Sequence, residues 1–226
     1  MAEELRDGRS TRWDPHRRER RTAIIRAAIA AIEAYGPDAP TGQIADLAGV
    51  PRTHVYRHFE GKQALDLAVS RYAAREIGEV IRAGLATQGS AMDVIRASID
   101  SHLGWIEAHP NLYRFLAQHA YAIAATGSPA DDAKAAFATE LTALLQGYMQ
   151  LFGVDTAPAE RVIIGVVGLV DTTAAWWLEH RDIGRDELTA ELSEQVWLII
   201  DRTASALGLH LDPNSELPAI PASVAR

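Results

Sequence analysis

The sequence contains no cysteine among its 226 residues. A chain without thiols forms no disulfide bond and no thiolate metal site, so a disulfide scaffold and a cysteine zinc site are both excluded. The N-terminal stretch MAEELRDGRSTRWDPHRRERR also lacks the apolar core that a secretory signal peptide requires. Both absences are typical of a cytoplasmic protein, and we expect this chain to be cytoplasmic.

Long apolar runs are also missing. The most apolar stretch, residues 162–178 (VIIGVVGLVDTTAAWWL), is interrupted by Asp171 and two threonines, so its unbroken part ends at Val170. A membrane-spanning helix needs roughly 20 predominantly apolar residues. The stretch therefore predicts a buried helix, and we expect no membrane partner.

Sustained alternation of apolar and polar residues, the pattern of a β-strand, is absent as well, and helical spacing dominates instead. Glycine and proline separate the helical segments, for example at Gly36-Pro37 and at Pro110. The predicted fold class is all-α, with an N-terminal three-helix unit fused to a C-terminal helical bundle. The nine expected helices span about residues 20–35, 41–48, 52–58, 63–86, 91–109, 111–124, 137–152, 158–180 and 186–207.

Positive charge is scarce over the whole chain, but it is concentrated near one end. The formal net charge is −8 at pH 7. Residues 1–62 nevertheless carry 11 Lys and Arg against 9 Asp and Glu, whereas residues 63–226 carry 11 against 21. Residues 5–26 alone contain 8 arginines and 3 acidic residues. This asymmetry indicates a basic, anion-binding end on an acidic body.

Residues 44–62, IADLAGVPRTHVYRHFEGK, are typical of a helix-turn-helix. In that motif a small residue such as Ala45 lets the second helix pack across the first, and Gly49 supplies a positive φ in the turn. The second helix then presents its N-terminal side chains outward, where DNA-reading helices contact bases. A solvated helical hairpin is the alternative. The expected core of the pair is Ile44, Ala45, Val50, Val55 and Phe59.

The polar half of this motif favours DNA over the plain hairpin. Arg52 can form two hydrogen bonds with guanine, and Thr53 can contact a thymine methyl group. Tyr56 and Lys62 suit phosphate oxygens, and an arginine-rich arm can follow the backbone or enter a minor groove. The candidate DNA-binding residues are Thr41, Arg52, Thr53, His54, Tyr56, His58, Lys62, Arg17 and Arg18.

The stretch TGQIADLAGVPRTHVYRHFEGKQALDLAV, residues 41–69, resembles the DNA-binding signature of the tetracycline-repressor (TetR) family of transcriptional regulators. Two positions depart from that signature: Pro51 stands where a Ser or Thr N-cap is common, and Gly42 has no side chain for a second contact. The matching residues are Thr41, Ile44, Ala45, Ala48, Gly49, Val50, Tyr56, His58, Phe59, Lys62 and Leu65.

The resemblance implies a repressor that binds a palindromic operator on double-stranded DNA as a homodimer and is released by a small effector. In the family, the effector occupies a cavity bounded mainly by the fifth to eighth helices. Aromatic residues in that region of this chain either fill the core or line such a cavity. Few of them adjoin charges, which favours a hydrophobic effector such as an acyl chain or a lipophilic drug. The candidate effector-binding residues are Trp105, Tyr113, Leu116, His119, Tyr148, Phe152, Thr172 and Trp176.

The last two expected helices carry the prediction of a dimer. The helix at 158–180 is apolar on nearly every side, and such a helix is covered both by its own core and by a partner. Burial within one subunit is the alternative. Asp171 on this helix should be paired, linked to water or protonated, because a bare buried carboxylate is costly. The candidate residues of a two-fold four-helix interface are Gly165, Gly168, Val196 and Ile200.

Other groupings carry little chemistry. His54 and His58 lie four residues apart, but no carboxylate completes a metal site with them, and His102 with His109 fits polar packing better than zinc. We expect no catalytic residue, no metal, no cofactor and no enzyme activity.

The expected domain organisation has four parts. They are a flexible basic arm (1–15), a helix-turn-helix domain (16–62), a ligand-binding and dimerisation domain (63–210) and a loose tail (211–226). Two alternatives for the function stay open. One is a helical ligand-binding protein of the same fold without DNA binding, and the other is a regulator whose ligand enhances DNA binding.

Overall fold

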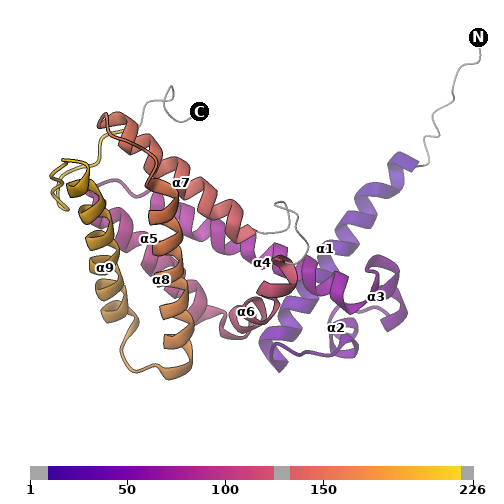
Figure 1. Cartoon of the computed structure of the whole chain (residues 1–226). Coiled ribbons are helices and arrows are strands. Elements are labelled where there is room, and N and C mark those ends of the chain that lie inside the picture. Colours follow the sequence, from indigo (N-terminus) through magenta and orange to yellow (C-terminus); the bar gives the residue numbers. More distant parts are fainter. Residues whose placement is uncertain (1–9, 125–132, 220–226) are drawn as a thin grey trace, which may run out of the picture. The chain divides into compact units, whose positions relative to one another are not determined.

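The computed structural model describes residues 10–124 and 133–219 (Figure 1). Within these residues the chain forms nine α-helices and no strand, which confirms the predicted all-α class. An isolated bridge between Ser90 and Glu216 is the one β-type pairing there. The helices are α1 (Ser10–Tyr35), α2 (Thr41–Leu47), α3 (Arg52–His58), α4 (Gly61–Leu85), α5 (Ala91–Ala108), α6 (Pro110–Ala124), α7 (Ala133–Leu151), α8 (Ala159–His180) and α9 (Arg185–Ala206).

The chain divides into two compact units. The N-terminal unit comprises Met1–Ala73 and Asn111–Tyr121, and the C-terminal unit comprises Ala74–Pro110 and Ala122–Arg226. The predicted boundary at residue 62 is therefore displaced into α4, which continues as one helix across it. The predicted domains also miss that most of α6 belongs to the N-terminal unit. The Asn111 side chain ties α6 to α1 there, because its amide donates a 2.9 Å hydrogen bond to the Glu33 carbonyl.

The helix pair at the centre of the N-terminal unit forms as predicted. Ile44, Ala45, Val55 and Phe59 are buried, while Val50 is half-buried. Gly49 adopts a positive φ of 62°, the conformation that the turn requires and that a side chain disfavours. Thr41 is the first residue of α2 and follows the N-cap, Pro40.

The predicted flexible arm is shorter than expected. Because α1 begins at Ser10, residues 10–15 are helical rather than part of an arm. Arginine and glutamate, which dominate residues 17–21, have high helix propensity and favour this extension. The rest of the predicted arm, residues 1–9, lies outside the described residues.

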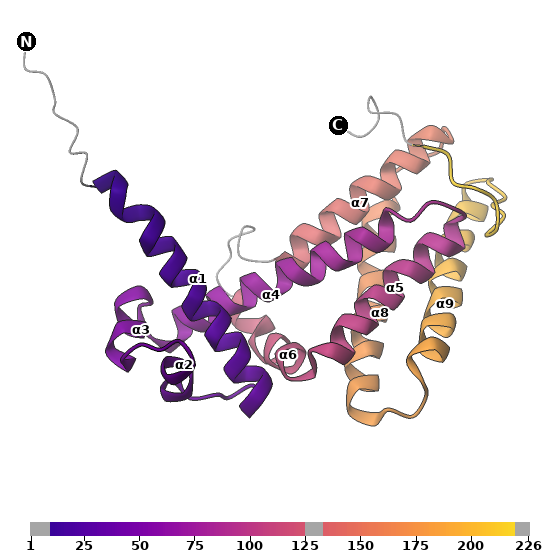
Figure 2. The same ribbon diagram turned by 180° about the vertical axis from the view of Figure 1, so that it is seen from behind.

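In the C-terminal unit, α8 and α9 lie side by side and run in opposite directions (Figure 1). Seen from behind, α5 packs across them (Figure 2). The start of α5 is fixed by a capping box, in which the Ser90 hydroxyl accepts from the Asp93 N–H and the Asp93 carboxylate accepts from the Ser90 N–H. Because α5 packs against both α8 and α9, one face of this helix pair is covered within the subunit.

The predicted loose tail is wrong for its described part. The Met92 N–H donates to the Pro213 carbonyl at 3.1 Å, and the Leu217 N–H donates to the Gly89 carbonyl at 3.0 Å. Asp212 accepts from the Asn214 N–H and folds the segment into a turn that brings these groups together. Pro213 and Leu217 thus bind to the first turn of α5 and to the loop before it, and residues 220–226 lie outside the described part.

Among residues 10–124 and 133–219, α8 is the one helix that is long and apolar enough to cross a membrane by length and composition. This is weak evidence for a span, because a core helix of a globular protein passes the same test. Only 22% of its most apolar window is buried within the chain. The prediction of a buried helix therefore holds for one side of α8 only.

Candidate nucleic-acid interface

The candidate DNA-contacting surface of the N-terminal unit is the outer face of α3. Arg52, Thr53 and Tyr56 are exposed and His54 is half-buried, whereas Val55 on the opposite side is 0% exposed. The short helix is therefore anchored by one apolar side chain and presents the others outward, as predicted for a DNA-reading helix. Arg57 is exposed too, and the predictions missed it although it lies four residues after Thr53 and one helical turn further on.

Thr41 is not on the surface, contrary to its predicted role as a direct DNA contact. It is 5% exposed and its hydroxyl accepts a 3.3 Å hydrogen bond from the Tyr56 hydroxyl. The Thr41 hydroxyl, which can donate to the ionised Tyr56 oxygen, and then the Arg52 guanidinium lower the pKa of Tyr56. Thr41 thus holds the Tyr56 side chain through this hydrogen bond, because the first residue of α2 packs against α3 instead of facing outward.

A cluster of cations surrounds the C-terminal end of α3. Burial lowers the pKa of His58 first, and the charges of Arg17, Arg20, His54 and Arg21 lower it further. Arg17 and Arg18 are exposed, as their predicted role requires, and so is Arg20, which the predictions did not include. The basic segment of α1 and the recognition helix thus share one electropositive region of the N-terminal unit.

Lys62 at the start of α4 has a partner within the chain. Its ammonium group pairs with the Asp66 carboxylate, and Asp66 is buried. The His119 Nε2 atom lies 3.8 Å from the other Asp66 oxygen. The Lys62 side chain is still exposed enough to bind a phosphate. Its positive charge would then be shared between that phosphate and Asp66. The sequence pattern did not reveal the pairing with Asp66.

The predicted effector-binding residues are divided between the two units. Tyr113, Leu116 and His119 belong to the N-terminal unit, and the others belong to the C-terminal unit. Thr172 and Trp176 are exposed on the outer side of α8, because they share one helical face with Gly165 and Gly168. They therefore cannot line an interior cavity of the subunit. Phe152 is also exposed, Tyr148 is half-buried and Trp105 is buried.

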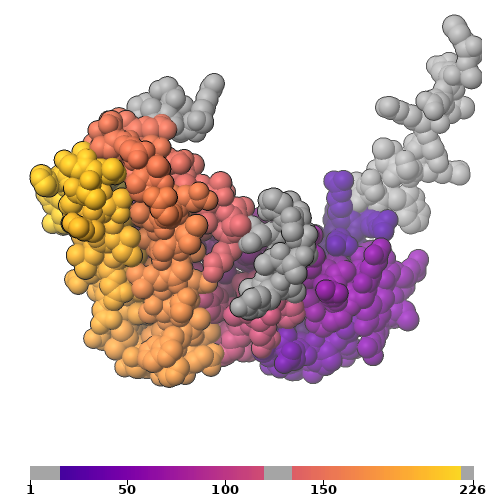
Figure 3. All heavy atoms as spheres, in the orientation of Figure 1, coloured from indigo at the N-terminus to yellow at the C-terminus, as the bar shows by residue number. Residues whose placement is uncertain are grey.

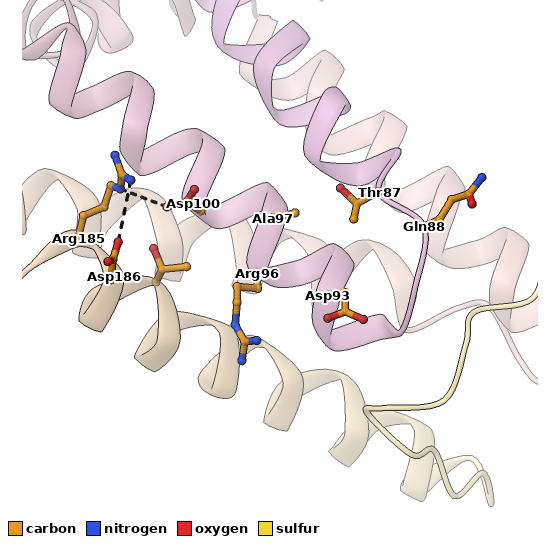
Figure 4. A pocket seen from close by; sticks show the side chains of 9 residues that line it. Thr87, Gln88, Asp93, Arg96, Ala97, Asp100, Arg185 and Asp186 are labelled. Atoms are coloured by element: carbon orange, nitrogen blue, oxygen red, sulfur yellow. Dashed lines mark ion pairs between the residues drawn. The ribbon is translucent and has the colours of Figure 1, made fainter.

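The C-terminal unit contains a groove between α5 and α9 with a volume of about 580 Å³ (Figure 4). The dashed lines in the figure mark ion pairs of Arg185 with Asp100 and with Asp186. Its lining is charged and includes no predicted effector residue, so it does not match a site for an apolar ligand. The lining residues are Thr87, Gln88, Asp93, Arg96, Ala97, Asp100, Arg185, Asp186 and Thr189.

Asp171 is paired, which was one of the three states predicted for it. Its carboxylate forms an ion pair with Lys134 of α7. His102 of α5 lies within reach of both charges: burial lowers its pKa, and Asp171 opposes that shift. Among the residues that the structure describes, no three His, Asp or Glu side chains gather closely enough to hold a metal ion.

One face of the α8–α9 pair is exposed and rich in apolar residues. Ile164 is 60% exposed, Trp176 is 50% exposed and Leu198 is 63% exposed. Gly165 and Gly168 lie on the same face and have no side chain to keep a neighbouring helix away. Figure 3 shows this pair of helices at the surface, in orange and yellow.

The other two predicted interface residues differ from this surface. Val196 is 4% exposed and packs inside its own subunit, so it is not available to a partner. Its place on the inner side of α9 follows from helical spacing, because Leu192 is buried four residues earlier. Ile200 is half-buried.

Comparison with known proteins shows similarity along most of the chain. Residues 24–69 match the family described as bacterial regulatory proteins, tetR family. Residues 80–208 match the tetracyclin repressor-like C-terminal domain. An uncharacterised HTH-type transcriptional regulator of Mycobacterium tuberculosis is 29% identical over 192 residues, which are 84% of this chain and 81% of that protein.

Solved structures share the fold. A tetR-family transcriptional regulator from Streptomyces coelicolor superposes with a TM-score of 0.65 at 23% identity, covering 84% of this chain and 83% of its own. The transcriptional regulator FadR from Bacillus subtilis, solved in complex with stearoyl-CoA, gives a TM-score of 0.57 at 18% identity and covers 77% of this chain and 96% of its own.

Proposed function

Because the chain belongs to the tetracycline-repressor family of bacterial transcriptional regulators, we propose that it is a ligand-responsive repressor that binds a palindromic operator as a homodimer. The observation that carries the proposal is the outer face of α3. Arg52, Thr53 and Tyr56 are exposed on a helix held by the buried Val55, and the cations of α1 lie near its C-terminal end. Base-reading and phosphate-binding groups thus belong to the same unit.

The exposed apolar face of α8 and α9 supports the dimer. On α8 the exposed Trp176 shares a face with two glycines, and α9 adds the exposed Leu198; these residues favour close packing against a second copy of the same helices. A two-fold dimer carries two copies of α3, which have to reach successive major grooves about 34–36 Å apart. A ligand that binds more tightly to another arrangement of the two subunits weakens DNA binding. The size of the effect is set by the difference between its affinities for that arrangement and for the DNA-bound arrangement.

For the effector we propose a long acyl chain, carried free or as a thioester of coenzyme A. The stearoyl-CoA complex of the structurally similar FadR supports this class. The apolar composition of the helices around Trp105 and Tyr148 is consistent with an acyl chain. A regulator of this kind acts in the cytoplasm and needs no cofactor.

The test begins with selection of binding sequences from a random pool of duplexes by the purified protein. We expect a palindromic consensus and salt-sensitive binding. Stearoyl-CoA, stearate and coenzyme A are then titrated separately into the complex. Release by the acyl compounds and not by coenzyme A supports the repressor, whereas tighter binding makes the ligand a co-repressor. Failure to select any sequence, with the ligand still bound, identifies a ligand-binding protein that does not bind DNA.

A further inference from the structure

Arg21 of α1 contacts the C-terminal end of α3 in two ways. Its Nη1 atom donates a 2.6 Å hydrogen bond to the backbone carbonyl of His58. Its guanidinium carbon lies 4.1 Å from the centroid of the Phe59 ring. The guanidinium thus makes a hydrogen bond and a cation–π contact at the same time. These contacts hold an exposed side chain in one place.

The helix that Arg21 contacts has few other restraints. α3 is seven residues long, its N-cap Pro51 makes no side-chain hydrogen bond, and Val55 is its one buried residue. A helix this short is not stable alone in water, so its direction depends on the groups that hold its ends. Its last carbonyls lack helical partners, and a cation at that end is favourable. Arg21 supplies both the donor and the charge.

The neighbouring arginines differ from Arg21 in this respect. Arg17 and Arg20 are exposed and act on His58 through their charge. Arg21, in contrast, donates directly to the backbone at the end of the recognition helix. A phosphate contact by Arg21 would have to break that hydrogen bond, whereas Arg17 and Arg20 can reach a phosphate without this cost.

We propose that Arg21 is a positioning residue that determines sequence selectivity. By holding the His58 carbonyl and the Phe59 ring, it sets the angle at which α3 meets the bases. The proposal rests on the proposed function, because it requires α3 to read DNA. It also requires a guanidinium rather than a charge alone, since its several N–H groups let Nη1 donate to the carbonyl while the central carbon lies over the ring, whereas lysine offers one compact ammonium group.

The test compares Arg21→Lys with Arg26→Lys, a control at an exposed position five residues later on the same helix. Both variants keep the net charge. The wild-type protein first selects a preferred duplex from a random pool. Fluorescence anisotropy then gives the affinity of each protein for that duplex and for a scrambled duplex of the same composition, over a series of salt concentrations. Circular dichroism melting gives the folded fraction.

We expect Arg21→Lys to lose about tenfold in affinity for the selected duplex, the size expected for losing a hydrogen bond to a charged group. Binding to the scrambled duplex and the salt slope should stay as in the wild type, because the charge remains. A second selection with this variant should give an altered consensus. Arg26→Lys should match the wild type throughout.

Two results overturn the proposal. Equal losses on both duplexes assign Arg21 to a phosphate or to overall folding, since a smaller folded fraction lowers both affinities by the same factor. Affinities for both duplexes that stay as in the wild type show that the two contacts of Arg21 do not affect selectivity. Failure of the proposed function looks different, because the wild-type protein then selects no duplex at all.

Discussion

Gly84 of α4 lies directly against the backbone of Ser98 in α5. A Cβ atom placed on Gly84 would be 2.6 Å from the Ser98 Cα atom and 2.8 Å from the Ala97 carbonyl oxygen. Backbone atoms cannot swing away as a side-chain end can, so the crossing of α4 and α5 in the C-terminal unit depends on this glycine.

We therefore predict that Gly84→Ala lowers the free energy of unfolding by about 1–3 kcal/mol, the usual cost of overpacking. Gly78→Ala on the same helix is the control, because its Cβ atom meets only the flexible end of Arg82, at 3.3 Å. That control should be neutral or gain about 0.5–1 kcal/mol from helix propensity. Urea unfolding measures both, and equal stabilities of the two variants would contradict the prediction.

The exposed guanidinium of Arg52 is expected to read a base. Arg52→Ala should weaken binding to the selected operator by about 1–3 kcal/mol and relax the preference at one base position. Affinities for a set of operators with single base changes measure this. A loss that is uniform across all sequences would assign Arg52 to a phosphate instead.

Lys62 is expected to contact phosphate while it stays near Asp66. Lys62→Ala should lower the affinity for every duplex and flatten the salt dependence by about one unit. Asp66→Asn should act in the opposite direction, because it removes the carboxylate that shares the Lys62 charge. Titrations at several salt concentrations measure both slopes, and an unchanged slope in Lys62→Ala rules out the phosphate contact.

His58 should make stability fall as the pH falls. Burial and the charges of Arg17, Arg20, His54 and Arg21 lower its pKa in the folded state below the ordinary value of 6.5. The unfolded chain therefore binds the proton first, and stability present above pH 6.5 is lost as the pH falls through the folded pKa.

His102 contributes in the same direction, since burial lowers its pKa as well. Chemical unfolding at a series of pH values from neutral to about pH 5 measures how the free energy of unfolding depends on pH. This range includes the ordinary pKa of histidine. His58→Gln should remove part of this dependence and His102→Gln another part. A slope that both variants keep in full would assign it to other groups.

Gly168 should matter for assembly. Gly168→Trp places a bulky side chain on the exposed face of α8 and should shift the protein toward monomer in sedimentation velocity. Ala83→Trp, at an exposed position of α4, is the control and should keep the wild-type assembly state. A dimer that persists in Gly168→Trp moves the interface to another surface.

Much of the fold was predictable because helix boundaries are local. Gly36-Pro37, the Gly49 turn and Gly153 end helices through their own backbone preferences, whatever packs around them. The outer face of α3 was predictable for the same reason: once Val55 points inward, helical spacing sends Arg52, Thr53 and Tyr56 outward.

The predicted interior positions of Thr172 and Trp176 are wrong, because periodicity does not say what covers an apolar face. Trp176 and Trp177 are adjacent and chemically equal, yet Trp177 is 1% exposed and donates its indole N–H to the Ile183 carbonyl at 2.8 Å, while Trp176 faces outward. Which of two adjacent tryptophans is buried depends on the direction of α8 against its neighbours, and residue type does not encode that direction.

The sequence alone determined nine helical segments, the helix-turn-helix and the family, because each depends on residues close together in the chain. The tertiary structure decided the contacts between distant residues. It put α6 with the N-terminal unit, His119 beside Asp66, Thr41 beneath Tyr56 and Arg21 against His58. Contacts between residues 15 to 53 positions apart form only after the helices have packed, so no local pattern reports them.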